Sequence, residues 1–399
     1  MHAQNDSGPS NIIGVLDAVD SVAITVRQSR CAMVRNRNAR CLKCAEACTS
    51  GCIHLVDGLL RIDASKCVGC GTCATVCPTC ALETHNPSDS ELLGNAKKAL
   101  RENCVAVMCH PCAEACGDAI RKNLVSEVVC LGRVDESLLV QLVVCGAREI
   151  ELVCGDCEKC AQRQGRACAK VVVNSAMDLL ALWDLPVNIN VEDSVPKRLV
   201  AEGHNLSEVS AAIEAHFAHG AGNDPIVRQK NLSVSCEGDS AEDTMAERAR
   251  VLRVMKDGTL PHFLPARRER LLDGLSALGR PSSDCIESRL WGCVAIDPQA
   301  CVSCRMCATF CPTGAIRKYD AEDGSFGVEH YPGDCVKCGT CRDICPAKAI
   351  TIKDSVRLSY LLDGMVHRYA MRPRPVELNS PHQILNTITR KISGNVYER

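Results

Sequence analysis

Thirty-one of the 399 residues are cysteine, and this content restricts what the chain can fold into more than any other feature. Residues 1–168 contain 20 of them and residues 293–345 contain nine, so two cysteine-rich blocks flank a stretch that is poor in cysteine. Such a content is typical of small secreted proteins held by disulfides, or of metal-binding proteins in a reducing compartment. The length of the chain and the odd number of cysteines disfavour the first alternative. We therefore expect metal–thiolate chemistry.

The start of the chain and its net charge narrow the cellular setting. The first eight residues are polar and contain no basic segment that leads into an apolar one, as a secretory leader would. No apolar run approaches the roughly 18 residues that a membrane span needs. We expect a cytoplasmic protein without a transmembrane segment. The formal net charge of −2 provides no basic surface field, so nucleic acid is not an expected partner.

The second cysteine-rich block contains one motif twice. Its four cysteines are separated by two, two and three residues, and proline follows the last of them. The first copy consists of Cys301, Cys304, Cys307 and Cys311, and the second of Cys335, Cys338, Cys341 and Cys345. This block closely resembles bacterial-type ferredoxins. In that family three closely spaced thiolates surround one face of a [4Fe–4S] cluster, and the cysteine before proline binds the other cluster.

The resemblance implies two clusters in this block, with their fourth ligands exchanged between the motifs. The ligands of one cluster would be Cys301, Cys304, Cys307 and Cys345. Those of the other would be Cys335, Cys338, Cys341 and Cys311. Paired C-x2-C units also occur in zinc sites with four thiolates. Two complete repeats that end in Cys-Pro favour iron–sulfur clusters over zinc.

The first block contains one complete motif and one altered motif. Cys67, Cys70, Cys73 and Cys77 have the full spacing, and Pro78 follows. Upstream, Cys41-Leu-Lys-Cys44-Ala-Glu-Ala-Cys48 lacks the first cysteine, and Cys31 is the nearest thiol before it. The segment resembles ferredoxin-like subunits whose first cysteine is displaced. By the same exchange of ligands, one cluster is assigned Cys31, Cys41, Cys44 and Cys77, and the other Cys67, Cys70, Cys73 and Cys48.

Cys31 has an alternative interpretation, because one unaligned cysteine has little specificity. It could be a spare buried thiol, with Cys52 as the substitute ligand or with a three-iron cluster at this site. We assign Cys31 as the ligand and expect Cys52 and Cys80 to be small buried residues beside the clusters.

Between the blocks, residues 95–185 alternate short apolar runs with helical segments, which predicts a parallel, flavodoxin-like α/β sheet. The predicted strands are Cys104–Cys109, Ser126–Cys130, Arg148–Cys154 and Lys170–Val173. The predicted helices are Ala113–Asn123, Asp135–Ala147, Glu158–Arg166 and a last helix that ends at Trp183.

Six cysteines follow the predicted strands and should converge, because the carboxyl ends of parallel strands lie at one edge of the sheet. They are Cys109, Cys112, Cys130, Cys154, Cys157 and Cys160. A converging set of soft ligands indicates a further iron–sulfur cluster. Cys104, Cys116 and Cys145 lie inside predicted strands or helices, and we expect them to be small apolar core residues. Cys168 is left unassigned.

Cys130-Leu-Gly-Arg-Val-Asp135, with the helix, strand and cysteines that follow it, resembles the delta subunit of methyl-viologen-reducing hydrogenases. The resemblance covers about 80 residues and implies a [2Fe–2S] cluster that passes electrons to heterodisulfide-reductase-type partners. The chain departs from the family at Cys154–Cys160, where the last cysteines are more closely spaced. The type of this cluster is left open.

A different function is suggested by Cys109-His-Pro-Cys112, which lies between a strand and a helix as a thioredoxin-like dithiol does. His110 would then lower the pKa of a thiol. A dithiol enzyme leaves Cys130 and Cys154–Cys160 unexplained, so we keep this as the alternative: a self-contained thiol/disulfide reductase fed by the clusters.

Residues 186–290 predict a mainly helical connecting region. Asn205-Leu-Ser-Glu208 is typical of a capping box and opens a helix to about His219. A second, charged helix is expected over Ala241–Met255, and a third over Pro265–Gly279 with a stripe of leucines. We expect Arg267, Arg268 and Arg270 of the third helix to face solvent, with an acidic partner as the alternative.

The sequence thus predicts an α/β plus α+β protein in five segments. These are ferredoxin-like dicluster modules at 25–90 and 291–352, the α/β domain at 95–185, the connecting region at 186–290 and a tail at 353–399. The sequence contains no phosphate-binding loop, no H-E-x-x-H motif and no dinucleotide-binding fingerprint. We therefore expect that the protein has no catalytic site of its own. The expected function is an electron relay with four [4Fe–4S] clusters and one further cluster, in an anaerobic complex. Its partner would be the catalytic subunit of a hydrogenase, formate dehydrogenase or heterodisulfide-reductase-type enzyme.

Overall fold

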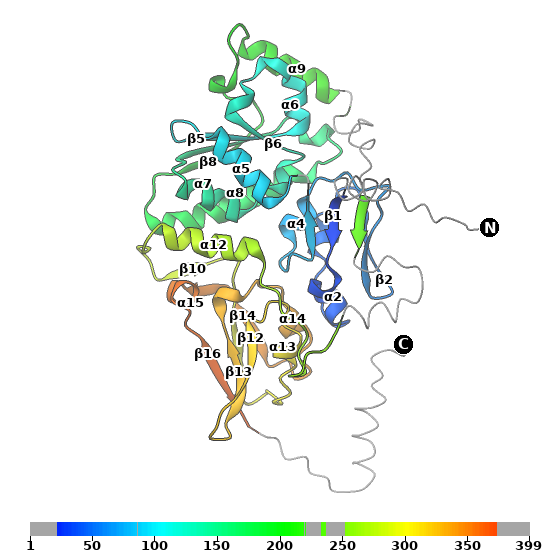
Figure 1. Cartoon of the computed structure of the whole chain (residues 1–399), viewed down its shortest axis with the longest axis vertical. Coiled ribbons are helices and arrows are strands. Elements are labelled where there is room, and N and C mark those ends of the chain that lie inside the picture. Colours follow the sequence, from blue (N-terminus) through cyan, green and yellow to red (C-terminus); the bar gives the residue numbers. More distant parts are fainter. Residues whose placement is uncertain (1–21, 86, 219, 221–232, 237–251, 373–399) are drawn as a thin grey trace, which may run out of the picture.

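The structure is a computed structural model that describes residues 22–85, 87–218, 220, 233–236 and 252–372. Figure 1 shows three folded parts: an α/β part at one end, a second cysteine-rich module at the other, and a first module beside them. Helix α12 (Ala266–Ala277) lies between the α/β part and the second module (Figure 1).

The first module combines a strand pair, a hairpin and very short helices. Strand β1 (Val22–Val26) runs antiparallel to β4 (Leu82–Thr84), and β2 (Ile53–Val56) forms a hairpin with β3 (Leu59–Ile62). A strand from the connecting region, β9 (Ser233–Cys236), pairs with β1 in parallel. The helical segments are η1 (Gln28–Arg30), α2 (Ala32–Arg35), α3 (Lys43–Glu46) and α4 (Thr72–Val76). With helices this short, cysteines make up much of the buried interior.

The second module repeats this plan. Strand β11 (Cys293–Ile296) runs antiparallel to β14 (Ile350–Lys353), and β12 (Ile316–Asp320) forms a hairpin with β13 (Phe326–His330). Its helical segments are α13 (Met306–Thr309), η8 (Pro332–Asp334) and α14 (Thr340–Asp343). In all four cysteine motifs of the chain, a helical turn follows the second cysteine position and includes the third.

The segment predicted as a tail begins with folded elements that cover the second module. Strand β16 (His367–Met371) pairs with β13, and β15 (Ser355–Arg357) pairs with β10 (Cys285–Glu287). Helix α15 (Leu358–Leu362) follows β15. The structured part of this region therefore extends at least to Arg372, where the described residues end.

The α/β part contains the expected parallel sheet of four strands. They are β5 (Cys104–Cys109), β6 (Val125–Val128), β7 (Glu149–Val153) and β8 (Asn188–Glu192), in the order β6-β5-β7-β8. The helices around it are α5 (Asp89–Ala99), α6 (His110–Cys116), α7 (Glu136–Val144), α8 (Gln164–Leu180) and α9 (Leu206–Ala218). Short 3-10 turns connect them: η2 (Gly117–Ala119), η3 (Lys122–Leu124), η4 (Leu131–Arg133), η5 (Cys157–Lys159), η6 (Ala181–Trp183) and η7 (Lys197–Leu199).

The prediction of a strand at Lys170–Val173 is wrong, because this valine run lies inside α8. Buried side chains of α8 follow helical spacing, and they include Ala169, Val172, Val173 and Ala176, while Val171 is 53% exposed. A run of β-branched residues favours a strand locally, but the apolar stripe over the whole segment has the period of a helix. The fourth strand is β8, beyond the predicted boundary at residue 185.

Two predicted helix starts are confirmed. Asp135 caps α7 by accepting a hydrogen bond from the Leu138 amide at 2.9 Å. Asn205 and Glu208 form the reciprocal bonds of a capping box at the start of α9. The helix expected at Ala241–Met255 lies mostly outside the described residues.

The prediction that the arginines of α12 face solvent is wrong. Leu271 and Leu275 of this helix are buried, and α12 packs on α7, with Gly274 close to Val140. Arg268 is only 6% exposed, and Arg267 and Arg270 bond to groups of the first module and of the α/β part. The charged face of α12 meets other parts of the chain, which a charge pattern alone cannot reveal. Among the helices of the described residues, none has the length and apolar character needed to cross a membrane.

Substitutions in α8 test its helical state. In a strand, Val171 and Val173 would lie on the same face, whereas in α8 Val173 is buried and Val171 is exposed. We expect Val173→Asp to lower the free energy of unfolding by at least about 2 kcal/mol, because it buries a charge in place of an apolar side chain. Val171→Asp should change it little. Equal losses in anaerobic thermal denaturation would contradict the helix.

Candidate iron–sulfur centres

The sixteen cysteines that the sequence analysis assigns as ligands make up four predicted sets, which we name sites A to D. Site A comprises Cys31, Cys41, Cys44 and Cys77, and site B comprises Cys48, Cys67, Cys70 and Cys73. Site C comprises Cys311, Cys335, Cys338 and Cys341, and site D comprises Cys301, Cys304, Cys307 and Cys345.

Site D surrounds a pocket in the second module. All four of its cysteines line this pocket, together with Ile296, Val302, Met306, Ile350 and other residues. The pocket contains about 330 Å³ of space, part of it open to solvent. Cys304 is exposed, whereas Cys307 is buried. Four thiols around an apolar pocket are the donor set that an iron–sulfur cluster requires.

At site C, the cysteine before proline meets the other motif, as expected. Beyond the effect of burial, the thiol of Cys311 lies close enough to those of Cys335, Cys338 and Cys341 to raise their pKa values by charge repulsion. Burial raises the pKa of Cys338 to about 12 and that of Cys335 to about 11. Thiols with such pKa values stay protonated at neutral pH unless a metal binds them. Buried thiols gathered in this way fit a metal cluster.

At site A, the structure brings the displaced cysteine to the other three. Cys31 is 7% exposed and lies near Cys41 and Cys77, and Cys44 lies near all three. Burial raises the pKa of Cys31 and of Cys44 to about 12. The segment between Cys31 and Cys41 begins with α2.

Site B contains a fifth thiol. The sulfur of Cys52 lies 3.5 Å from that of Cys48 and is also within hydrogen-bonding distance of Cys67. The hydrogen bond with Cys52, ahead of burial, raises the pKa of Cys48 to about 12. Cys52 therefore lies with site B and not with site A, where the alternative interpretation needed it.

Backbone amides are directed at several of these sulfurs. The Ala81 amide donates to the sulfur of Cys77 at 3.3 Å, and the Ala349 amide donates to that of Cys345 at 3.4 Å. Both amides lie four residues after the cysteine that precedes proline. Gly71 and Gly339 begin α4 and α14 with φ values of 78° and 82°, a left-handed conformation that glycine adopts readily. Amide–sulfur bonds of this kind stabilise thiolates and tune iron–sulfur clusters.

Contacts between neighbouring residues link the four sites in a series, which we call the row. Cys44 of site A lies near Cys73 of site B, and Cys307 of site D lies near Cys341 of site C. Arg35 lies between sites A and C and is 2% exposed. It is the last residue of α2, the helix that begins directly after Cys31. Its guanidinium bonds to the carbonyl oxygen of Cys311 at 3.2 Å. The order along the row is D, C, A, B.

The thiol-rich edge of the sheet continues this row. Cys109 ends β5 and lies near Cys112 and Cys157, while Cys130 follows β6 and lies near Cys109 and Cys157. Cys160 lies near Cys109, and Cys154 shares a hydrogen bond with Cys157. The six thiols therefore lie close together at this edge. Cys70 of site B is also near Cys130 and Cys160, so site B adjoins this edge.

The remaining thiols of the α/β part differ in surroundings. Cys116 is buried and bonds to Cys112. The expectation of a core position is wrong for Cys145, which is exposed at the end of α7, and for Cys104, which is part-exposed and bonds to Glu149. Cys168 lies 3.9 Å from the carbonyl oxygen of Gly132, beside η4.

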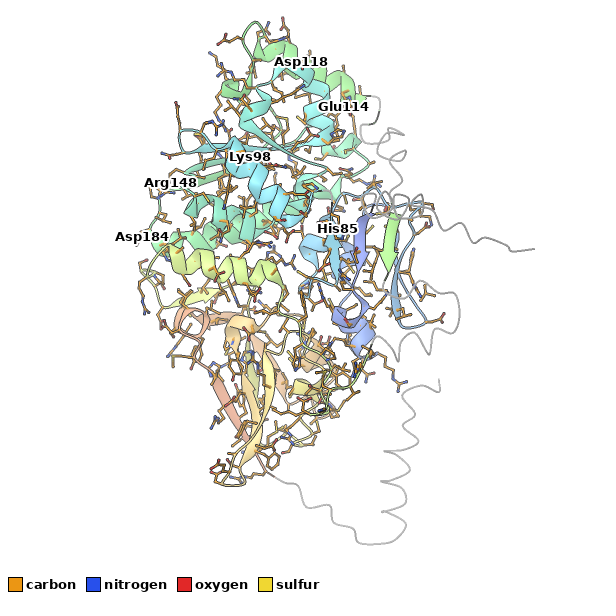
Figure 2. The ribbon with its side chains drawn as sticks, in the orientation of Figure 1. His85, Lys98, Glu114, Asp118, Arg148 and Asp184 are labelled. Carbon is orange, nitrogen blue, oxygen red and sulfur yellow. The ribbon has the colours of Figure 1, made fainter. Side chains whose placement is uncertain are left out.

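The sequence does not predict that three arginines lie beside the cysteine sites. Arg35 adjoins site C, Arg267 bonds to the carbonyl of Cys77, and Arg268 lies near Cys335. No local pattern marks them, because each contacts a segment distant in the sequence. Figure 2 shows the junction of the parts, where His85 lies between the first module and the α/β part. Within the described residues, no three or more His, Cys, Asp or Glu side chains are placed to hold a single metal ion.

Comparisons with known proteins identify both cysteine-rich blocks. Residues 284–353 match the family described as a 4Fe-4S dicluster domain, and residues 60–83 match a 4Fe-4S binding domain. A stretch of 43 residues is 42% identical to one component of the ion-translocating oxidoreductase complex of Methanosarcina acetivorans. That stretch covers 11% of this chain and 16% of that protein. Ferredoxin-type 4Fe-4S domains are thus present, and the matches support an iron–sulfur electron-transfer role.

Proposed function

We propose that the protein is an electron-relay subunit that carries four [4Fe–4S] clusters at sites A to D. The observation that carries the proposal is the single row of thiol sets, in the order D, C, A, B, with each set adjoining the next. The 4Fe-4S domains matched in both blocks support the cluster type. A relay needs closely spaced centres that exchange electrons one at a time, and a row of this kind meets that need.

Each bound cluster supplies a centre that accepts and returns one electron. The chain's own residues hold it with thiolates, donate amide hydrogen bonds to the sulfurs and exclude water from the inner sites. Sites A and C lie at the interface of the two modules, where Arg35 is almost fully buried. Site D has an exposed cysteine, Cys304, and is the end of the row at which an electron-transfer partner would dock.

The other end of the row would be a fifth cluster at the thiol-rich edge of the sheet. Six thiols meet there, and Cys130 and Cys160 lie near Cys70 of site B. The resemblance to the delta subunit of methyl-viologen-reducing hydrogenases favours a [2Fe–2S] cluster. We propose a hydrogenase, formate dehydrogenase or heterodisulfide-reductase-type enzyme as the catalytic partner. The matched component of the ion-translocating oxidoreductase also belongs to a complex.

A second candidate function is a thiol/disulfide reductase at Cys109 and Cys112. It is supported by the hydrogen bond between these thiols at the start of α6, and by His110, which bonds to Glu127 at 2.5 Å. That bond, ahead of the opposing effect of burial, raises the pKa of His110. The candidate leaves Cys130, Cys154 and Cys157 without a role, so the cluster is preferred.

The metal content tests the cluster assignment. Protein purified without air should be brown and contain about 16 to 18 irons per chain with a similar amount of acid-labile sulfide, from four cubanes with or without a two-iron centre. Elemental analysis and sulfide determination measure both. Stoichiometric zinc with little iron would contradict the proposal.

Serine substitutions test the ligands of site A. Cys31→Ser should remove or alter one cluster, a loss of up to about four irons per chain, because serine replaces one of four thiolates. Its matched control is Cys52→Ser, which should keep the full iron content because Cys52 supplements the four thiols of site B. The reverse result, with Cys52 essential and Cys31 silent, would overturn the assignment of Cys31.

Substitutions at the sheet edge separate the two functions of the α/β part. In the full chain, Cys130→Ser should abolish the spectroscopic signal of the fifth cluster and leave the four cubanes, whereas Cys145→Ser at an exposed position should abolish none. Electron paramagnetic resonance of the reduced proteins provides the readout. A dithiol that cycles at Cys109 and Cys112, with no iron lost in Cys130→Ser, would support the reductase instead.

A further inference from the structure

The two cysteines that precede proline at the inner sites share an unusual contact. Cys77 follows α4 and belongs to site A, and Cys311 follows α13 and belongs to site C. In each case the carbonyl groups around the cysteine accept hydrogen bonds from an arginine that comes from another part of the chain. Carbonyls at the end of a helix lack partners within the helix, so they attract such donors.

Arg35 makes this contact at site C. Its Nη2 donates to the carbonyl of Cys311 at 3.2 Å, its Nε to that of Phe310 at 3.4 Å, and its Nη1 to those of Pro261 and Ser29 at 2.7 and 2.9 Å. A guanidinium group stays protonated at neutral pH in proteins. Arg35 is therefore a cation inside the interface of the two modules, where it is 2% exposed.

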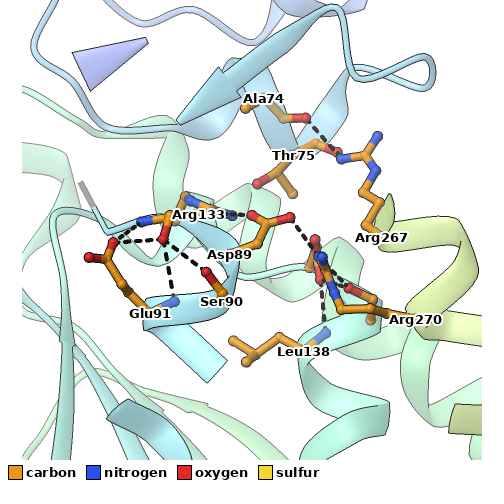
Figure 3. Close-up of polar contacts among 12 residues, drawn as sticks. Ala74, Thr75, Asp89, Ser90, Glu91, Arg133, Leu138, Arg267 and Arg270 are labelled. Carbon is orange, nitrogen blue, oxygen red and sulfur yellow. Dashed lines mark hydrogen bonds and ion pairs between the residues drawn. The ribbon is translucent and has the colours of Figure 1, made fainter. Parts of the chain in front are cut away.

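Arg267 makes the equivalent contact at site A. Its Nη1 donates to the carbonyls of Ala74 and Thr75 at 2.9 and 2.8 Å (Figure 3), and its Nη2 donates to that of Cys77. The guanidinium of Arg267 is likewise protonated at neutral pH and lies beside the carbonyl of Cys77.

A fixed positive charge beside a cluster favours the reduced form. Reduction adds one negative charge to a cluster that thiolates already make anionic, and the attraction of a nearby cation for that charge is weakly screened in a buried site. Burial, net charge and hydrogen bonds to the ligands are the means by which a protein sets the potential of such a cluster. Guanidinium groups held by carbonyls cannot turn away from the site.

We propose that Arg35 and Arg267 are positioning residues that raise the reduction potentials of the clusters at sites C and A, so that these two inner sites are reduced first. The inference rests on the proposed function. With clusters bound at sites A and C, each inner site would store one electron, so the interface of the modules would hold up to two. The outer sites B and D would pass electrons to and from this pair.

The charge of each arginine is tested by paired substitutions in the full protein purified without air. Arg35→Gln and Arg267→Gln should each shift one cluster transition to a more negative potential, and the double variant should shift two. Redox titration followed by electron paramagnetic resonance measures the transitions. Arg35→Lys and Arg267→Lys keep the charge and should leave the potentials close to the original values, although they lose hydrogen bonds.

Arg270→Gln is the matched control. Arg270 lies on the same helix as Arg267 but bonds to Asp89 at 2.6 Å and to Ser137 at 3.3 Å (Figure 3). It should shift no transition. If a Gln variant loses iron, the Met variant of the same arginine, which keeps similar volume without charge, is titrated in its place.

Two outcomes would overturn the inference: unchanged potentials in charge-removing variants with full iron content, or equal shifts in the Lys and Gln variants. Either would leave the proposed relay intact, because the clusters would still be present. An original protein without iron would instead refute the proposed function itself. The metal analysis of the original protein therefore separates the two failures.

Discussion

The burial of many cysteine thiols in a few close groups is the constraint on which the rest of this structure depends. Helices of the two modules are about one turn long, so they contribute little core of their own, and cysteines make up much of the buried surface. Burial raises the pKa values of these thiols, and metal binding supplies the charge that lets them ionise. In such small modules, metal–thiolate bonds would add to the small apolar cores, and folding and cluster assembly would then be coupled.

The contacts between the parts of the chain also form at the buried cysteines. A cysteine before proline ends a helical turn with unpaired carbonyls, and those carbonyls accept bonds from Arg35 or Arg267. Each arginine thereby connects two parts of the chain at a cluster site. Docking of the parts and the electrostatics of the inner sites are consequences of one set of contacts.

Much of the candidate site could be predicted from the sequence, because ligand spacing is a local property. The complete motifs at Cys67, Cys301 and Cys335, the convergence of thiols at the sheet edge and the parallel sheet itself follow from local patterns. The valine run at 171–173 favours a strand over three residues, whereas the helical period of the apolar side chains extends over the whole of α8. The arginines of α12 could not be placed, because their partners, such as Ala74 and Asp89, are distant in sequence.

Anomalous diffraction at the iron edge, from crystals grown without air, tests the central claim most directly. The account predicts iron at four positions in one row, in the order D, C, A, B, with Cys31 bound to the iron at site A and Arg35 between sites A and C. Any fifth iron centre should lie at the sheet edge beyond site B. Iron missing from the row, or zinc in its place, would contradict the account.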